Sequence, residues 1–299
     1  MHKKMKEALN DGGYGAATQK AYLGCLSRFL KFHEGKDPHT MGEAEVEAFV
    51  GRLEAAGAAA STRNQALDAL GFFFKKVLGR DASPGATRRA EKEPRMPQVL
   101  SREEVRALLG ALNGVAAVQS GLLYGCGLRI SECLALRVRD FDLDAGTLDV
   151  RGAKTRRTLA IPARLKPVLE IQLDHARAVH ESDVRRGAAP ADNPGGAWVF
   201  PAEGELTPER EDEPAPRRPH VHEVSLARAL VRAAKLAGIT KRVTAHTLRH
   251  SYAVHLLLKG VPMRTLQSLL GHANLQTTQI YARVVQAIQG PVRSPLDEL

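Results

Sequence analysis

A short segment after the first quarter of the chain limits how the chain can fold. Residues 81–98 (DASPGATRRAEKEPRMPQ) contain three prolines and many charges, and their few apolar residues follow no regular period. This composition is typical of a linker, because proline interrupts helices and strands and little apolar surface is available for packing. A chain of 299 residues is also long enough for two domains of ordinary size. We therefore expect a domain at 1–82, a linker at 83–98, a second domain at 99–290 and a tail at 291–299.

The first domain is predicted to be all-α. Apolar side chains recur at helical spacing from Tyr22 to Leu30 and again from Ala66 to Val77. Thr18 and Ser61 are the predicted N-caps of these two helices, and residues 42–56 form a further helical pattern. The pattern stops at Gly79, which is a typical helix-end residue.

The second domain is predicted to be mainly helical with a small antiparallel sheet, so the fold class is mainly α within an α+β arrangement. A capping box at 101–104 (SREE) marks its first helix. Residues 147–151 and 158–161 alternate like strands around a basic turn at 152–157, which predicts a β-hairpin. Residues 182–220 are irregular, and a loop of this length is usually functional or disordered. Further helices are predicted at 164–181, 223–236, 244–258, 262–270 and 277–288.

The chain is strongly basic. Lysine and arginine outnumber aspartate and glutamate by 43 to 33, which gives a net charge of +10. Residues 1–80 contribute +3 and the remainder contributes +7, so the excess is not confined to one tail. Positive charge spread over both domains fits a nucleic-acid partner, although an anionic membrane surface or a merely solvated basic face would have the same charge.

The cysteines and the N-terminal residues suggest the cellular compartment. Cys25, Cys126 and Cys133 are odd in number and none has C-x-x-C spacing, so we expect neither a disulfide framework nor a zinc ribbon. A reducing cytoplasm is the usual setting for such a chain. Residues 1–10 are polar and lysine-rich, and no run of about 18 apolar residues follows, so we expect no signal peptide and no membrane span.

Four short motifs in the second domain carry the candidate chemistry. They are G-C-G-L-R-I-S-E at 125–132, G-A-K-T-R-R at 152–157, H-T-L-R-H at 246–250 and L-G-H-A-N-L-Q-T-T-Q-I-Y at 270–281. A basic hairpin turn is common, and an H-x-x-R pair arises by chance in a chain of this length. Only the four motifs together, in this order and within one domain, form a specific signal.

This combination resembles the tyrosine recombinase, or phage integrase, family over about residues 100–290. The first 80 residues are similar to that family's helical core-binding (SAM-like) domain. Within the family the chain is most similar to the integron integrases. The similar segments are A-H-T-L-R-H-S-Y-A-V-H-L-L, W-V-F-P-A at 198–202 and the tail G-P-V-R-S-P-L-D-E-L at 290–299. The resemblance implies a DNA recombinase that moves gene cassettes in a bacterial cytoplasm, acting at the nucleoid.

One feature departs from the integron pattern. Integron integrases carry an inserted segment before the W-V-F-P-A region, with which they recognise folded single-stranded sites. The corresponding stretch here, residues 181–197, is short and lacks their apolar-aromatic pattern. An ordinary double-strand site-specific recombinase of the Xer type therefore stays open as an alternative.

The resemblance implies roles for seven residues. Tyr281 is the nucleophile that forms a 3′-phosphotyrosine with DNA. Arg129 and Arg249 bind the non-bridging phosphate oxygens, a task that suits the planar guanidinium fork. Glu132, three residues after Arg129, orients that arginine or a histidine.

Proton transfer and phosphate binding fall to the remaining residues. His246 accepts or relays the phenol proton, and His272 hydrogen-bonds the phosphate. Lys154 on the hairpin turn protonates the leaving 5′-hydroxyl. Arg156 and Arg157 are alternative occupants of that place, although an arginine is a poor proton donor at neutral pH. His250 and His255 are interpreted as packing or DNA-facing residues, and Trp198 as a core residue more than a base-stacking platform.

No metal and no cofactor are expected. A phosphotyrosine keeps the energy of the broken bond, so ATP is not needed, and the chain has neither a G-x-x-x-x-G-K-[ST] loop nor a carboxylate cluster for two ions. The expected partner is DNA, as double-stranded or folded single-stranded recombination sites. The resemblance further implies a homotetramer on two paired sites, with the tail docking on a neighbouring protomer.

Two other classes of function are compatible with parts of the sequence. A non-catalytic site-specific DNA-binding protein would keep the charge and the fold but lose one of Arg129, Arg249 or Tyr281, and all three are present. A zinc hydrolase could use the i, i+4 pair His246 and His250, but no third ligand is near in the sequence.

Overall fold

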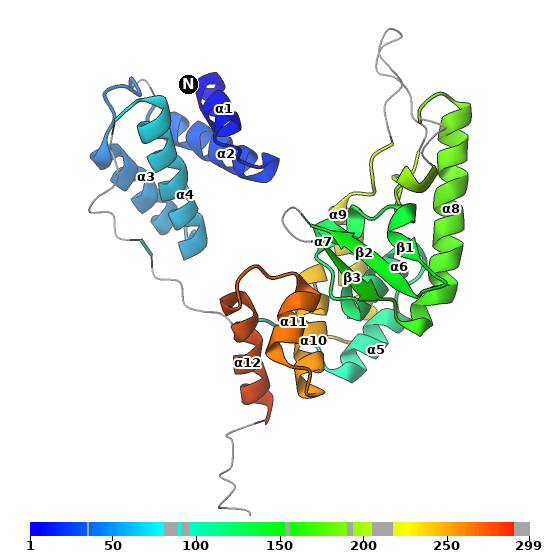
Figure 1. The fold of residues 1–299 in the computed structure, drawn as a ribbon. Helices are drawn as coiled ribbons and strands as arrows, with labels where there is room; N and C mark the ends of the chain where they lie inside the picture. Colours follow the sequence, from blue (N-terminus) through cyan, green and yellow to red (C-terminus); the bar gives the residue numbers. More distant parts are fainter. Residues whose placement is uncertain are drawn as a thin grey trace, which may run out of the picture. The chain divides into compact units, whose positions relative to one another are not determined.

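The protein, represented by a computed structural model, divides into two compact units, residues 1–95 and 96–299 (Figure 1). It is mainly helical with one small antiparallel sheet, which confirms the predicted fold class. Most of the predicted linker and the whole predicted tail lie outside the described residues, so their boundaries stay predictions. The structure describes residues 1–34, 36–80, 89–90, 96–152, 156–189, 194–204 and 218–289.

In its described residues, the N-terminal unit has four α-helices followed by a short π-helical turn at Phe73–Val77. Phe29 and Phe74 are fully buried at its centre. The helices are α1 (His2–Asp11), α2 (Ala16–Phe32), α3 (Glu43–Ala55) and α4 (Ala60–Phe72). Sequence analysis did not single out α1, whose Met5 and Leu9 lie one turn apart and are both buried.

The two predicted N-caps in this unit were wrong. The helix α2 begins after Gly15, whose extended backbone supplies the cap, and α4 begins after Ala59. Thr18 and Ser61 therefore lie in the first turns of these helices. A hydroxyl residue is tolerated in a first turn, so its presence alone does not locate the start of a helix.

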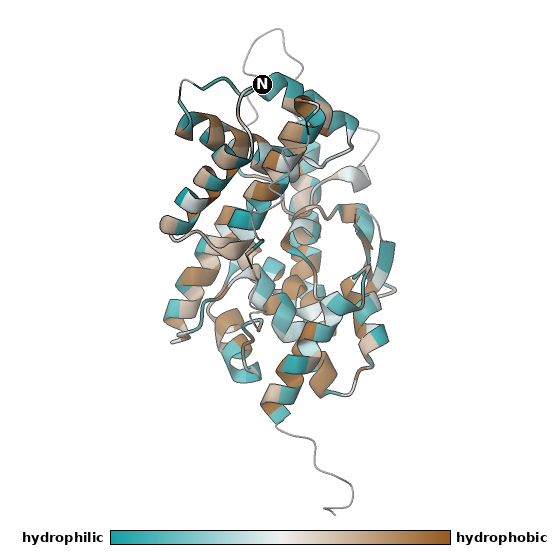
Figure 2. Ribbon diagram, turned by 90° about the vertical axis from the view of Figure 1, so that its left-hand side faces the viewer, coloured by the Kyte–Doolittle hydropathy of each residue, from teal (hydrophilic) through white to brown (hydrophobic). Residues whose placement is uncertain are grey.

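Most helices of the C-terminal unit pack around a large apolar core that includes Leu122, Phe200 and Leu248. Its last three helices enclose a second cluster, which includes Leu266 and Tyr281. Its helices are α5 (Arg102–Gly110), α6 (Gly114–Gly125), α7 (Ile130–Leu134), α8 (Lys166–Arg185), α9 (Glu223–Leu236), α10 (Ala245–Leu258), α11 (Met263–Leu270) and α12 (Gln276–Gln289). Figure 2 shows hydrophobic and hydrophilic residues alternating along these helices, as expected of helices with one face in a core. None of the helices in the described ranges is both long and apolar enough to cross a membrane.

The sheet confirms the predicted hairpin. Strands β1 (Phe141–Asp142), β2 (Thr147–Arg151) and β3 (Arg156–Ala160) pair antiparallel in the order β1-β2-β3. The register places Thr147 opposite Ala160 and Arg151 opposite Arg156. Because side chains alternate along a strand, Arg157 points to the same side as the buried Leu159. This orientation directs Arg157 into the C-terminal unit.

Two capping boxes fix the starts of helices that carry or support the site. The Ser101 hydroxyl accepts a hydrogen bond from the backbone N–H of Glu104 at 3.1 Å, which confirms the predicted start of α5. The Thr244 hydroxyl accepts from the backbone N–H of Thr247 at 3.2 Å and caps α10. Each cap satisfies an N–H that would otherwise lack a partner.

Candidate active site

The first motif builds a tight turn between α6 and α7. Gly127 adopts a left-handed backbone with φ of +63°, and a Cβ there would lie 2.4 Å from the ring of Tyr252. Only glycine fits this position, because other residues would suffer both strain and a clash. The turn points the Gly127 carbonyl at the site and leaves Arg129 as the N-cap of α7.

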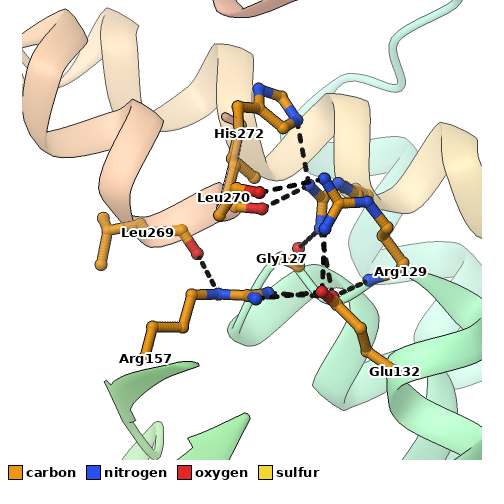
Figure 3. Close-up of polar contacts among 9 residues, drawn as sticks. Gly127, Arg129, Glu132, Arg157, Leu269, Leu270 and His272 are labelled. Atoms are coloured by element: carbon orange, nitrogen blue, oxygen red, sulfur yellow. Dashed lines mark hydrogen bonds and ion pairs between the residues drawn. The ribbon is translucent and has the colours of Figure 1, made fainter. Parts of the chain in front are cut away.

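Three arginines from three motifs meet at the C-terminal end of α11 (Figure 3). Arg157 Nε, Arg249 Nη2 and Arg129 Nη2 donate to the carbonyl oxygens of residues 269, 270 and 271 at 2.9, 2.7 and 3.3 Å respectively. The last carbonyls of a helix lack intrahelical partners and carry partial negative charge, so cations are stabilised there. Gly271, with φ of 60°, ends the helix and turns the chain toward the arginines.

The carboxylate of Glu132 lies at the centre of these arginines. Both Nη atoms of Arg157 donate to it at 2.9 Å, and Arg129 donates from Nη1 and from its backbone N–H at 2.8 Å. Arg249 Nη1 lies 3.5 Å from Oε2. Burial alone raises the pKa of Glu132, but the hydrogen bonds from Arg157 and from the Arg129 backbone outweigh it and lower the pKa to about 2.

The cluster holds more positive than negative charge. Three guanidinium groups surround one carboxylate, which leaves an excess of +2. The Arg249 side chain is 4% exposed, and burial, with Arg129 as the next cause, lowers its pKa to about 10. Arg129 is the open member, with its side chain 36% exposed. A buried cationic excess is costly unless an anion completes it, and guanidinium forks match phosphate oxygens.

His272 is held in one tautomer beside this cluster. Its Nε2 lies 3.0 Å from Arg249 Nη2, and its Nδ1 lies 2.9 Å from the hydroxyl of Thr278. Because arginine only donates, Nε2 must accept, and the proton resides on Nδ1. Burial and then the charge of Arg249 lower the pKa of His272 to about 4, so the ring is neutral and orients Arg249.

The candidate nucleophile lies on α12. Tyr281 is 2% exposed, and its phenol oxygen lies 2.9 Å from Nδ1 of His250 on α10. Burial raises the pKa of Tyr281, and the charges of Arg249 and Arg129 oppose that rise. The phenol is therefore within electrostatic range of the arginine cluster.

Two residues, His246 and Lys154, were predicted to transfer protons at the site. His246 is exposed in the first turn of α10, its ring centroid is 6.3 Å from that of His250, and within the described chain no hydrogen bond joins it to Tyr281. Lys154 lies outside the described residues. The structure thus brings Arg129, Glu132, Arg249 and His272 together.

Sequence analysis missed three residues of the site. Arg157 appeared only as an alternative to Lys154, yet it holds Glu132 with two hydrogen bonds. Its position two residues before Leu159 on the inward side of a strand could have indicated this. His250 was interpreted as packing or DNA-facing but contacts Tyr281, and Thr278 was not considered.

In the described part of the chain, no three His, Cys, Asp or Glu side chains are grouped to hold a metal ion.

Comparison with known proteins covers both units. The model of the Phage integrase family matches residues 98–287, and that of the Phage integrase N-terminal SAM-like domain matches residues 1–83. An integrase/recombinase of Escherichia coli is 39% identical over 315 aligned residues, which cover 99% of this chain and 93% of the relative. Tyrosine recombinase XerD of Caulobacter vibrioides is 34% identical over 288 residues, 91% of this chain and 84% of that protein.

The fold has a match among solved structures. The chain of a lambda integrase dimer bound to a COC′ core site has a TM-score of 0.68 at 17% identity, over 99% of both chains. The family models and the sequence relatives cover the same residues that carry the four motifs and the arginine cluster. The chain therefore belongs to the phage integrase family of tyrosine recombinases.

Proposed function

We propose that this protein is a site-specific DNA recombinase that cleaves and rejoins DNA through a 3′-phosphotyrosine at Tyr281. The observation that carries the proposal is the excess charge of +2 formed by Arg129, Arg157 and Arg249 around Glu132. The charges of Arg249 and Arg129 also act on the pKa of the Tyr281 phenol. A phosphodiester completes this charge distribution, and its charge grows in the transition state, where a preorganised cationic site stabilises it most.

The proposed reaction exchanges one phosphoester for another. The Tyr281 oxygen attacks phosphorus, the bond to the 5′ oxygen breaks, and the strand end remains on the protein. Arg129 and Arg249 bind the non-bridging oxygens, and Lys154 supplies the proton that the 5′ oxygen needs. The new bond conserves the energy of the old one, so religation requires no ATP, and the arginines supply the charge stabilisation that metal ions supply elsewhere.

The histidines complete the proposed site. His272 orients Arg249 in the free protein through an unprotonated Nε2. To hydrogen-bond the phosphate as a donor, Nε2 gains a proton once the substrate anion is bound. His246, exposed on the same face of α10 as His250, relays a proton between the site and solvent.

The finer proposal is an integron integrase that acts as a homotetramer on paired DNA sites. The W-V-F-P-A segment and the tail support it, whereas the short stretch at 181–197 favours the alternative, a Xer-type recombinase of double-stranded sites. The Trp198 ring is covered by the Arg137 guanidinium and meets His220 edge-on at 5.1 Å. Cleavage of the same site, supplied once as a duplex and once as a folded single strand, distinguishes an integron integrase from a Xer-type recombinase.

The covalent reaction is tested with nicked suicide duplexes. Because the target site is unknown, a duplex is first selected from a random-sequence pool by binding to the Tyr281→Phe protein, which cannot cleave. The wild type is then incubated with nicked copies of that duplex in excess EDTA, and products are separated in denaturant. The expected result is a protease-sensitive protein–DNA band with the wild type and none with Tyr281→Phe.

Other results of this experiment would favour a different function. Tight binding of the selected duplex without any covalent band would favour a non-catalytic DNA-binding protein. Cleavage that releases free DNA ends without a covalent band, and that stops in EDTA, would indicate a metal-dependent hydrolase. Adduct formation only on folded single strands would support the integron proposal over the double-strand alternative.

A further inference from the structure

We propose that His250 is a further catalytic residue, the group that takes the phenol proton of Tyr281 during strand cleavage. This inference rests on the proposed function, because it assigns a step of that reaction. The phenol oxygen bonds to phosphorus, the bond from phosphorus to the 5′ oxygen breaks, and the phenol proton moves to Nδ1 of His250, while the 5′ oxygen takes a proton from the acid. In religation the 5′-hydroxyl attacks, and His250 returns the proton to the departing phenolate.

The contact between the two side chains is direct. His250 on α10 and Tyr281 on α12 face each other from packed helices, with Nδ1 and the phenol oxygen 2.9 Å apart. Their ring centroids are 5.6 Å apart with the planes at 54°. This separation is within the range required of a general base and its proton. The sequence motif gives this task to His246, but that side chain lies one turn away.

The surroundings keep the accepting nitrogen free. Burial, followed by His246 and Arg249, lowers the pKa of His250 to about 4, so the ring is neutral at neutral pH. With the ring proton on Nε2, Nδ1 has a lone pair for the phenol O–H. A phosphodiester on the arginine cluster cancels part of the positive charge that opposes protonation of His250. The proton affinity of His250 therefore rises when the substrate is in place.

The helix α10 also provides a matched control. His255 Nδ1 lies 2.9 Å from the phenol oxygen of Tyr124, with ring centroids 5.8 Å apart. His255 is 8% exposed, so its loss removes a buried imidazole and a histidine–tyrosine hydrogen bond of the same geometry. Tyr281 is untouched by that change.

The experiment measures the rate of covalent adduct formation on the selected nicked duplex. Wild type is compared with His250→Ala, His250→Asn and His255→Asn, each checked for folding by circular dichroism. Asparagine places an amide oxygen where Nδ1 lies, so it keeps an acceptor but cannot bind the proton. We expect both His250 variants to be slower by about 10²-fold or more. His255→Asn should stay within about tenfold of the wild type.

A second arm changes the acidity of the nucleophile. Replacement of Tyr281 by a fluorinated tyrosine lowers the phenol pKa and reduces the dependence of the reaction on a base. The defect of His250→Asn should then shrink by about tenfold or more. A defect that came only from misplacement of the phenol would stay the same.

Several results would overturn the proposal. They are adduct formation by His250→Asn at the wild-type rate, an equal loss in His255→Asn, and a defect that fluorination leaves unchanged. Failure of the proposed function is separate, because the wild type itself would then form no adduct. Nitrogen NMR of histidine-labelled protein without DNA still tests the inference in that case. An unprotonated Nδ1 on neutral His250 supports it, and a protonated Nδ1 contradicts it.

Discussion

Two arginine–carboxylate arrangements in the described part of the C-terminal unit differ in charge balance. Around Glu132, three guanidinium groups share one carboxylate. Elsewhere in the unit, Arg218 and Asp183 form a one-to-one pair, with two hydrogen bonds of 2.7 Å and side chains 13% and 4% exposed.

The two arrangements affect their arginines in opposite directions. The hydrogen bond that Arg218 donates to Asp183 raises the pKa of Arg218, whereas burial and Arg129 lower the pKa of Arg249 to about 10. Arg218 also donates to the carbonyl of Ala202 at 2.6 Å, and its own carbonyl accepts from the Trp198 indole at 2.9 Å. A balanced pair of this kind ties loop segments together. By contrast, surplus positive charge that lowers the pKa of one of its own arginines, as at Arg249, indicates a binding place for an anion.

The largest expected effect is on catalysis, from Arg249→Ala. Loss of this guanidinium should slow covalent adduct formation by about 10³-fold, because it removes a preorganised donor to the phosphate. Arg218→Ala should lower thermal stability but keep the rate per folded molecule within about tenfold of the wild type. Quantified adduct bands from time courses measure both.

Arg249→Lys sharpens this test. Lysine keeps the charge but loses the fork, so an intermediate rate is expected. Equal rates in Arg249→Ala and Arg218→Ala would remove the distinction between the two arrangements.

The next effect is on stability. Glu132→Gln leaves the buried Arg157 and Arg249, and the half-buried Arg129, without their anion. It should lower the free energy of unfolding by about 3 kcal/mol. Asp183→Asn leaves one arginine, which carbonyl oxygens still hold, and should cost about 2 kcal/mol. Urea unfolding in chloride buffer, without multivalent anions, measures both. A larger loss in Asp183→Asn would contradict the charge-excess argument.

Local signals in the sequence predicted much of the fold. The capping box at 101–104 and the hairpin strands depend on residues close in the chain, and both were confirmed. The helix at 223–236 was predicted with the bounds that the structure has. Local signals failed where several residues could serve, as at Thr18, because the extended backbone of Gly15 supplies the cap without a side-chain signature.

The candidate site was only partly predictable for a physical reason. Motifs identified Arg129, Arg249 and Tyr281, and the spacing of three residues paired Glu132 with Arg129, but the partners distant in sequence were not predicted. The bond from Arg157 to Glu132 spans 25 residues of sequence, and that from His250 to Tyr281 spans 31. Such contacts depend on how β3, α10 and α12 pack, which no local pattern specifies.

A smaller effect concerns pH, because burial, and then the charges of the arginine cluster, hold His272 in its neutral form. Its pKa is about 4 in the folded protein against an ordinary value of 6.5, as is that of His250. The unfolded chain therefore binds more protons between these values, and stability falls as pH drops from about 6.5 to about 4. The Glu132 contribution is lost in a lower window, from 4.5 toward about 2.

Thermal melts at closely spaced pH values test whether the histidine contribution to stability is lost at a higher pH than the Glu132 contribution. We expect the wild-type Tm to fall by roughly 4 °C between pH 6.5 and pH 4, with a smaller slope in His272→Asn. A slope in His272→Asn equal to that of the wild type would show that the ring is not held neutral by the cluster.

The smallest effect probes the charge excess directly with inorganic phosphate. An anion that binds only the folded protein stabilises it, by about 1.4 kcal/mol at ten times its Kd, so the wild-type Tm should rise by roughly 3 °C. Chloride at matched ionic strength separates binding from screening. Arg218→Ala should keep the rise, because Asp183 already balances the charge of Arg218. Arg129→Gln should lose most of it, since Arg129 is the member of the cluster that solvent reaches. If the rise in Tm disappeared in Arg218→Ala and persisted in Arg129→Gln, phosphate would bind at the Arg218–Asp183 pair and not at the Glu132 cluster. The charge excess at Glu132 would then no longer support the proposed active site.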